Sequence, residues 1–328
     1  MKRNPSIELF RCACMFGVCL LHALTQGGYA GPHRGLDNLM TPSVVGFLFI
    51  SGWFGIRLKV GHVAKLMGVG LYCAATLAIV YQGGWLGQWS AGALFGHFWQ
   101  HFSGSWFLWC YFALMLIAPA FEPLFAKKPQ GGDMDILKFV LPLLILVFGW
   151  SYAATKIPVL KAHTPHVGGF GAFGVLTFVG IYVAARTCRY YDIEKYLSTR
   201  RLLLIAAVSG AFCWIGFMHY HSPFAFVFAG SVFFLFKRIK IRSPRMERAI
   251  LFLSPSMFSV YLLHNSGLGM TWLRNTEDAL LGAQEHNYYL VCFGVAAVLF
   301  LGSLLLDLPR RMVLRVVKKA KGQGEQRS

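Results

Sequence analysis

Ten long apolar segments, separated by short basic connections, recur along the 328 residues. A helix that crosses a bilayer needs about 20 mostly apolar residues, because each backbone polar group must be hydrogen-bonded inside the segment. The pattern therefore predicts an all-α integral membrane protein, and 56% apolar against 13% charged residues excludes a water-soluble domain. The predicted spans are 7–26, 39–58, 64–82, 105–125, 136–154, 170–187, 201–218, 222–236, 249–273 and 287–307.

Short connections favour one transmembrane domain over residues 1–328, with a basic tail from about residue 318 that we expect to be flexible or to lie on anionic headgroups. The span 222–236 is short. Ser254-Pro255-Ser256 lies near the start of the span 249–273. Since proline removes a helical hydrogen bond, we expect one or both of these spans to be tilted, kinked or broken.

Lysine and arginine residues predict the orientation of the bundle. With ten spans both termini lie on one side, and every one of the 31 basic residues falls on that side except Arg34, Lys156, Lys161 and Arg274. The positive-inside rule then predicts cytoplasmic N- and C-termini. The net charge is +18, but the basic residues recur at alternate helix ends and do not form one patch with interleaved aromatics. This distribution argues against nucleic acid as a partner.

The first span carries three ionisable residues, Glu8, Arg11 and His22, which are costly inside a membrane. Glu8 and Arg11 are three residues apart and able to pair. His22 follows Arg11 by eleven residues, roughly 16 Å along the same helical face. An arginine can hold an anionic donor while an imidazole removes a hydroxyl proton, but a headgroup-level arginine and a structural histidine remain the alternative.

Other spans carry fewer polar features. His264 and Tyr261 lie three residues apart on the ninth span, where His264 can approach His22 or make a structural hydrogen bond. Ser51 and Gly52 form a small pair in a bulky helix, which allows close approach of another backbone or of a ligand. Arg57 and Lys59 follow this helix at its cytoplasmic end. They either bind phosphate groups or only reflect the positive-inside rule.

Four motifs in order resemble those of the acyltransferase-3 family of membrane-bound O-acyltransferases, over nearly the whole chain. Arg11 followed after ten residues by His22 matches the first motif, and Phe49-Ile-Ser-Gly-Trp53 resembles the second, F-x-S-G-aromatic. Gly104-Ser-Trp-Phe-Leu108 with Pro119 resembles W-F-L…P, and 259–264 resembles S-x-Y-x-x-H. Ser105 departs from the more polar residue that many relatives have before the tryptophan.

The resemblance implies transfer of an acyl group, usually acetyl from acetyl-CoA, to a hydroxyl of a sugar, glycan or other small acceptor at the bacterial cytoplasmic membrane. It implies His22 as the catalytic base and Arg11 as a positioning or donor-binding group. Ser51, Trp106, Tyr261, His264 and Glu8 are then expected to line the site, and Arg57 and Lys59 to bind the donor. Tyr261, Ser51 or Trp106 is available to meet the oxyanion, and no metal is expected because a thioester is already activated.

Two other classes of function stay open. A carrier or exporter of a lipid-linked or small polar substrate usually has carboxylates at mid-membrane, whereas Glu122, Asp307, Glu277 and Glu285 are predicted near span ends or in loops. A zinc or pH-sensing surface is suggested by the i, i+4 spacing of His97 and His101.

The connection 82–104 contains no lysine or arginine and is predicted to lie outside. Its tryptophans, Trp85, Trp89 and Trp99, are expected either to anchor at the interface or to stack on a sugar. No cysteine or carboxylate nearby completes a metal-ligand set with the histidines, and the eight cysteines are expected to be reduced packing residues.

Overall fold

The computed structural model describes residues 3–26, 34–82, 90–126, 135–149, 174–216, 222–281 and 287–325, and within these ranges all regular structure is helical. The first half comprises α1 (Pro5–Gln26), α2 (Arg34–Met40), α3 (Pro42–Phe54), α4 (Val60–Tyr81), α5 (Ala91–Ser103), α6 (Trp106–Phe121) and α7 (Asp135–Leu144). The second half comprises α10 (Val175–Tyr190), α11 (Thr199–Trp214), α12 (Pro223–Lys237), α13 (Pro244–Leu253), α14 (Met257–His264), α15 (Gly267–Leu281) and α16 (Tyr288–Glu325).

Five described segments are long and apolar enough to cross a membrane: Pro5–Thr25, Val60–Tyr81, Trp106–Phe125, Pro244–His264 and Tyr288–Val317. Each overlaps a predicted span, which confirms the all-helical membrane architecture. The remaining predicted spans overlap shorter helices, such as α3 with 13 residues and α12 with 15. The total of ten spans and the side on which the termini lie stay predictions.

The ninth predicted span is interrupted twice. Ser254-Pro255-Ser256 forms a 3-10 turn between α13 and α14, at the proline where a tilt, kink or break was expected, and Pro244–His264 as a whole still has spanning length. The helix also ends at His264, and α15 starts three residues later at Gly267. The span predicted over 249–273 therefore ends at His264 in the structure, and its last predicted residues belong to α15.

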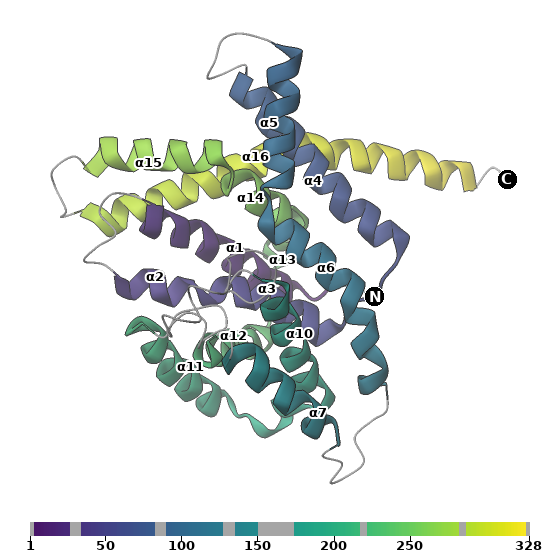
Figure 1. Ribbon diagram of the computed structural model, residues 1–328, viewed down its shortest axis with the longest axis vertical. Helices are drawn as coiled ribbons and strands as arrows, with labels where there is room; N and C mark the ends of the chain where they lie inside the picture. The colour runs from purple at the N-terminus through teal and green to yellow at the C-terminus, as the bar shows by residue number, and fades with distance from the viewer. Residues whose placement is uncertain are drawn as a thin grey trace.

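The predicted external connection 82–104 contains a helix, α5, which extends away from the bundle in Figure 1. Trp99 lies on α5 with 56% of its surface exposed, while Trp85 and Trp89 lie outside the described residues. At the other end of the chain, α16 continues through the start of the basic tail to Glu325.

α1 lies in the middle of the bundle, with α15 and α16 on one side and α10, α11 and α12 on the other (Figure 1). It runs antiparallel to α16, because the start of α16 meets the end of α1. Tyr288 donates its hydroxyl proton to the Leu24 carbonyl, and the Cys292 sulfur lies 3.6 Å from the Ala23 carbonyl. The residues of α1 are therefore held from both sides, which fixes the side chains that it carries.

Candidate active site

Two histidines from distant parts of the chain form a hydrogen bond inside the bundle. Nδ1 of His22 on α1 lies 2.9 Å from Nε2 of His264, the last residue of α14. His264 is 1% exposed, whereas His22 is partly exposed. The structure thus brings His264 to His22, which is one of the two alternatives that the sequence left open.

The second bond of His264 determines where the protons lie. Its Nδ1 lies 2.7 Å from the Val260 carbonyl oxygen, which only accepts, so Nδ1 carries the proton. A neutral imidazole then accepts at Nε2, and Nδ1 of His22 must be the donor. Neutral His22 is left with a lone pair on Nε2, for which no hydrogen-bond partner occurs among the described residues. This is the tautomer that a general base requires.

A cavity of about 610 Å³, the main cavity, lies between α1, α3, α4, α6 and α14. Its inner wall is aromatic and apolar, with Phe107, Tyr111, Phe258 and Tyr261 among its residues. Tyr261 connects this wall to the histidine pair, because its ring centroid lies 5.8 Å from that of His264. A ligand in the main cavity can therefore contact Tyr261, whose ring neighbours His264, although neither histidine is among the described lining residues.

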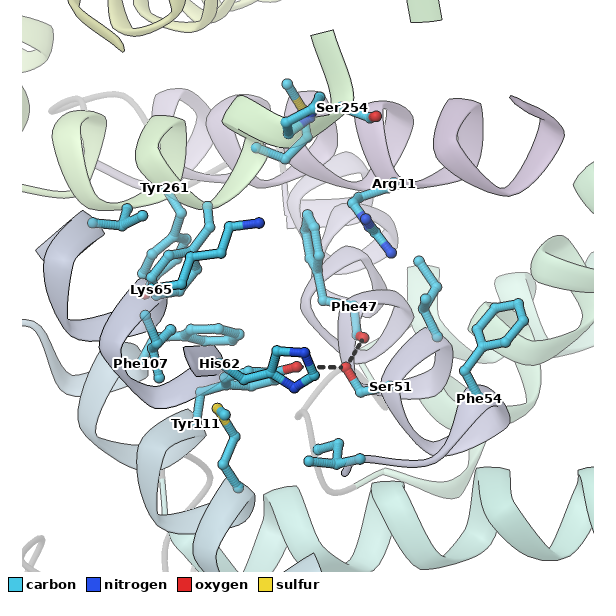
Figure 2. A pocket seen from close by; sticks show the side chains of 18 of the residues that line it. Arg11, Phe47, Ser51, Phe54, His62, Lys65, Phe107, Tyr111, Ser254 and Tyr261 are labelled. Carbon is cyan, nitrogen blue, oxygen red and sulfur yellow. Dashed lines mark hydrogen bonds between the residues drawn. The ribbon is translucent and has the colours of Figure 1, made fainter. Parts of the chain in front are cut away.

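Cationic side chains surround the opposite end of the main cavity. Arg3, Arg11, Arg57 and Lys65 line it, together with His62. Figure 2 shows Arg11 pointing into the space from α1, across from Ser51 and Tyr111. Four cations above an apolar, aromatic channel suit a ligand with phosphate groups at one end and a long uncharged arm.

Arg11 is held by the carboxylate predicted to pair with it. Its Nη1 donates to Oε2 of Glu8 at 3.0 Å, and Glu8 is buried. The pair places the guanidinium beside the main cavity while leaving further N–H groups to donate. Glu8 itself is not among the described residues that line this cavity, so its contribution is to position Arg11.

The F-x-S-G-aromatic segment has two separate structural roles. Ser51 donates to the Phe47 carbonyl at 3.1 Å, and its hydroxyl lies 3.1 Å from that of Tyr111 in the wall of the main cavity (Figure 2). Gly52 faces away, against α10: a Cβ there would lie 2.4 Å from the Tyr182 carbonyl oxygen. The small pair thus permits the close backbone approach that the sequence predicted.

Below this segment a half-buried hydrogen-bond network joins the residues that follow α3 and α6 to α10. The Tyr182 hydroxyl donates to Glu122 at 2.5 Å and accepts from the backbone N–H of Ile56 at 3.1 Å. Arg186 donates to both carboxylate oxygens of Glu122, at 3.1 and 2.7 Å. Gly55, at φ +75°, turns the chain beside this network and into Arg57. The network therefore fixes the end of α3 from which Arg57 reaches the main cavity.

The W-F-L segment and the S-x-Y-x-x-H segment meet at the inner wall. The Trp106 ring packs edge-on against those of Tyr261 and Phe178, at 6.5 and 6.0 Å. Ser259, at the start of the second segment, accepts from Arg310, which also donates to both oxygens of buried Asp307. The segment thus links the histidine pair, the cavity wall and α16.

A model of the acyltransferase-3 family, described as an acyltransferase domain, matches residues 4–307. The chain belongs to this family. No curated protein and no solved structure matches it. In this membrane acyltransferase, all four motifs that suggested the family contribute residues to the main cavity or to the neighbouring histidine pair.

The structure brings most of the predicted site residues of this acyltransferase together. Arg11, Ser51, Arg57 and Tyr261 line the main cavity; His22, His264, Glu8 and Trp106 lie beside its walls. Lys59 is exposed before α4 and is not among the described lining residues, so the structure does not place it with the others.

Sequence reasoning missed several residues of the acyltransferase site. Lys65, His62, Arg3 and Tyr111 line the main cavity. The first three belong to connections that were counted only for orientation, and Tyr111 follows Trp106 by five residues without a motif of its own.

Two carboxylates of the acyltransferase are more deeply buried than predicted. Asp307 is fully buried and paired with Arg310. Glu277, expected in a loop, lies on α15 with 0% exposure, and neither carboxylate oxygen has a hydrogen-bond partner among the described residues. Burial, together with the nearby Asp278 charge, raises the pKa of Glu277 to about 8.

The described part of the chain contains no group of three His, Cys, Asp or Glu side chains that could hold a metal ion, so nothing there supports the zinc alternative. The ring of His97 instead packs on Tyr81, with centroids 4.1 Å apart. All eight cysteines are free, and most are buried, which agrees with the predicted packing role.

Proposed function

We propose that this acyltransferase transfers a short acyl group, acetyl in the first instance, from acyl-CoA to a hydroxyl of a sugar, glycan or other small acceptor at the bacterial cytoplasmic membrane. The observation that carries the proposal is a cavity of about 610 Å³ that is lined by four cations and by Tyr261, whose ring neighbours the hydrogen-bonded pair of His264 and His22. Coenzyme A has the matching sequence of phosphates, an extended pantetheine arm and a terminal thioester.

In the proposed mechanism, Arg11, Arg57 and Lys65 bind the donor phosphates on the cytoplasmic side, and the arm extends along Phe107 and Tyr111. Nε2 of His22 removes the acceptor hydroxyl proton as the oxygen attacks the thioester carbonyl. The tetrahedral intermediate collapses with cleavage of the C–S bond, and the imidazolium returns the proton to the departing thiolate. An ester and free coenzyme A result.

Two side chains support this chemistry from the wall. Nε2 of His264 accepts a hydrogen bond from Nδ1–H of His22. This bond stabilises the positive charge that develops on the His22 ring. The Tyr261 hydroxyl, whose oxygen accepts from Asn265 at 2.9 Å, is the proposed donor to the oxyanion.

The test is coenzyme A release from acetyl-CoA by purified protein with a panel of hydroxylated acceptors, comparing wild type with His22→Ala. We expect acceptor-dependent release that falls by about 10²–10⁴-fold in the folded variant. Equal release by both proteins would remove His22 from the mechanism.

A carrier is the second candidate, because buried Glu277 has no hydrogen-bond partner among the described residues and membrane carriers use such carboxylates. Donor and acceptor binding without any release of coenzyme A, together with substrate uptake into proteoliposomes that Glu277→Gln abolishes, would favour it.

A further inference from the structure

A second cavity, the lateral groove, reaches the histidine pair from another direction. It has a volume of about 320 Å³ and lies between α4, α14, α15 and α16. Leu77, Leu263, Trp272, Leu299, Gly302 and His264 are among its lining residues. His264 thus borders the groove while its Nε2 meets His22, so an occupant of the groove lies against His264, one member of the histidine pair.

The groove opens toward the outside of the bundle. Three of its lining residues, Val80, Val298 and Leu306, are 41%, 55% and 39% exposed. α4, α14 and α16 all belong to segments long and apolar enough to cross a membrane. The medium at this opening is therefore lipid hydrocarbon and not water.

The chemistry of the lining selects the kind of occupant. Among the described lining residues, none carries a carboxylate, an ammonium or a guanidinium group, and the polar side chains are His264, Ser303 and the Trp272 indole. A free sugar would lose its hydrogen bonds to water here without replacing them. A hydrocarbon chain loses none, and the surrounding bilayer supplies it.

We propose that the lateral groove binds the hydrocarbon chain of an amphiphilic acceptor, which enters from the bilayer and presents its hydroxyl-bearing end to His22. The inference rests on the proposed function, since it names the class of acceptor for the same acyl transfer. The donor uses the main cavity and the acceptor uses the lateral groove, so the two substrates meet at the histidine pair from separate entrances.

Gly302 offers a variant that fills the groove without disturbing the protein. A Cβ at this position would meet no atom within 4 Å, and Gly302 lines the groove. Gly294 lies on the same helix, also with open space at its Cβ, but is not among the groove residues. Gly302→Phe therefore blocks the groove, and Gly294→Phe is the matched control for folding.

The first test is photolabelling in nanodiscs with hexadecanol that carries a diazirine in its chain and a terminal alkyne. We expect labelled peptides from α4 and α16, with labelling reduced about tenfold by Gly302→Phe and unchanged by Gly294→Phe. Equal labelling of both variants, or labelling confined to other helices, overturns the proposal. Equal thermal unfolding of the two variants confirms that Gly302→Phe is folded.

The second test compares acceptors that share one hydroxylated headgroup and differ only in having or lacking an alkyl chain. Gly302→Phe should raise KM for the alkylated acceptor about tenfold and leave KM for acetyl-CoA unchanged. An unchanged KM for the alkylated acceptor overturns the acceptor role. If the wild type transfers to no acceptor at all while groove labelling persists, the proposed function has failed and the lipid site has not.

Discussion

Nδ1 of His22 lies 2.9 Å from Nε2 of His264, and this bond connects residues 242 positions apart. Because neutral His264 donates its single ring N–H, at Nδ1, to the Val260 carbonyl, its Nε2 can only accept a hydrogen bond from Nδ1–H of His22. Two residues of different motifs thus behave as one unit, in which His264 fixes the tautomer and orientation of His22. The separate substitutions described below test this dependence.

Replacing His264 should lower turnover without weakening donor binding. We expect His264→Ala to reduce kcat about 10²-fold, because His22 loses both its orientation and the acceptor for its Nδ1 proton. His264→Gln should retain part of the activity, since its amide oxygen can accept the same hydrogen bond. Steady-state kinetics with acetyl-CoA would measure this. Equal loss in both variants, with folding intact, would contradict a tautomer-fixing role.

Removing the Arg11 guanidinium should weaken the binding of the acyl-CoA donor. We expect Arg11→Ala to raise KM for acetyl-CoA about tenfold with a smaller change in kcat, because a charge-assisted bond to phosphate contributes about 1.5–3 kcal/mol. The difference from wild type should shrink at high salt. Lys59→Ala is the matched control, since Lys59 is an exposed cation outside the described lining of the main cavity. An equal rise in both variants would indicate only a general charge effect.

The Tyr182 hydroxyl should contribute to stability. Tyr182→Phe leaves the buried Ile56 N–H and a Glu122 oxygen without one partner each, and we expect a loss of about 1–3 kcal/mol. Thermal unfolding in detergent would report it. Tyr196→Phe, at a 70% exposed tyrosine, is the control. If the two variants unfold at the same temperature, the network does not hold α3 to α10.

Gly52 should tolerate no side chain. Gly52→Ala would bring a methyl group 2.4 Å from the Tyr182 carbonyl oxygen, and because backbone cannot move aside cheaply, we expect destabilisation by about 1–3 kcal/mol. Gly294→Ala has open space at the same atom and should be neutral or slightly stabilising. Thermal unfolding of the two variants measures the difference, and a neutral Gly52→Ala would refute the close packing of α3 on α10.

Glu277 should make stability depend on pH. Because burial raises its pKa to about 8, the folded state keeps the proton longer than the unfolded state, and stability falls as pH rises from about 4.5 to about 8. Glu277→Gln cannot lose a proton. Its unfolding temperature should therefore exceed that of the wild type by an amount that grows across this pH window and is constant above it. A difference independent of pH would contradict the raised pKa.

The sequence predicted which side chains of the candidate site come together better than it predicted the detailed fold, for physical reasons. Hydrophobicity over about 20 residues detects a span but not a break such as the one after His264, where Gly269 packs against the His264 carbonyl. The Arg11 to His22 spacing predicts one helical face, whereas the sequence left the contact with His264 as one of two alternatives, because it does not determine how α1 and α14 pack. Glu277 was not, because its burial depends on the packing of α15, and α5 was missed because its connection lacks a full-length apolar run.

α14 is only eight residues long, and both cavities use it as a wall: Tyr261 faces the main cavity and His264 borders the lateral groove. A ligand that shifts this helix from one side must change the affinity on the other. Thermodynamic reciprocity then requires that the two occupants alter each other's dissociation constants by the same factor. Cooperativity between donor binding and acceptor binding would thus be transmitted by the two helical turns of α14.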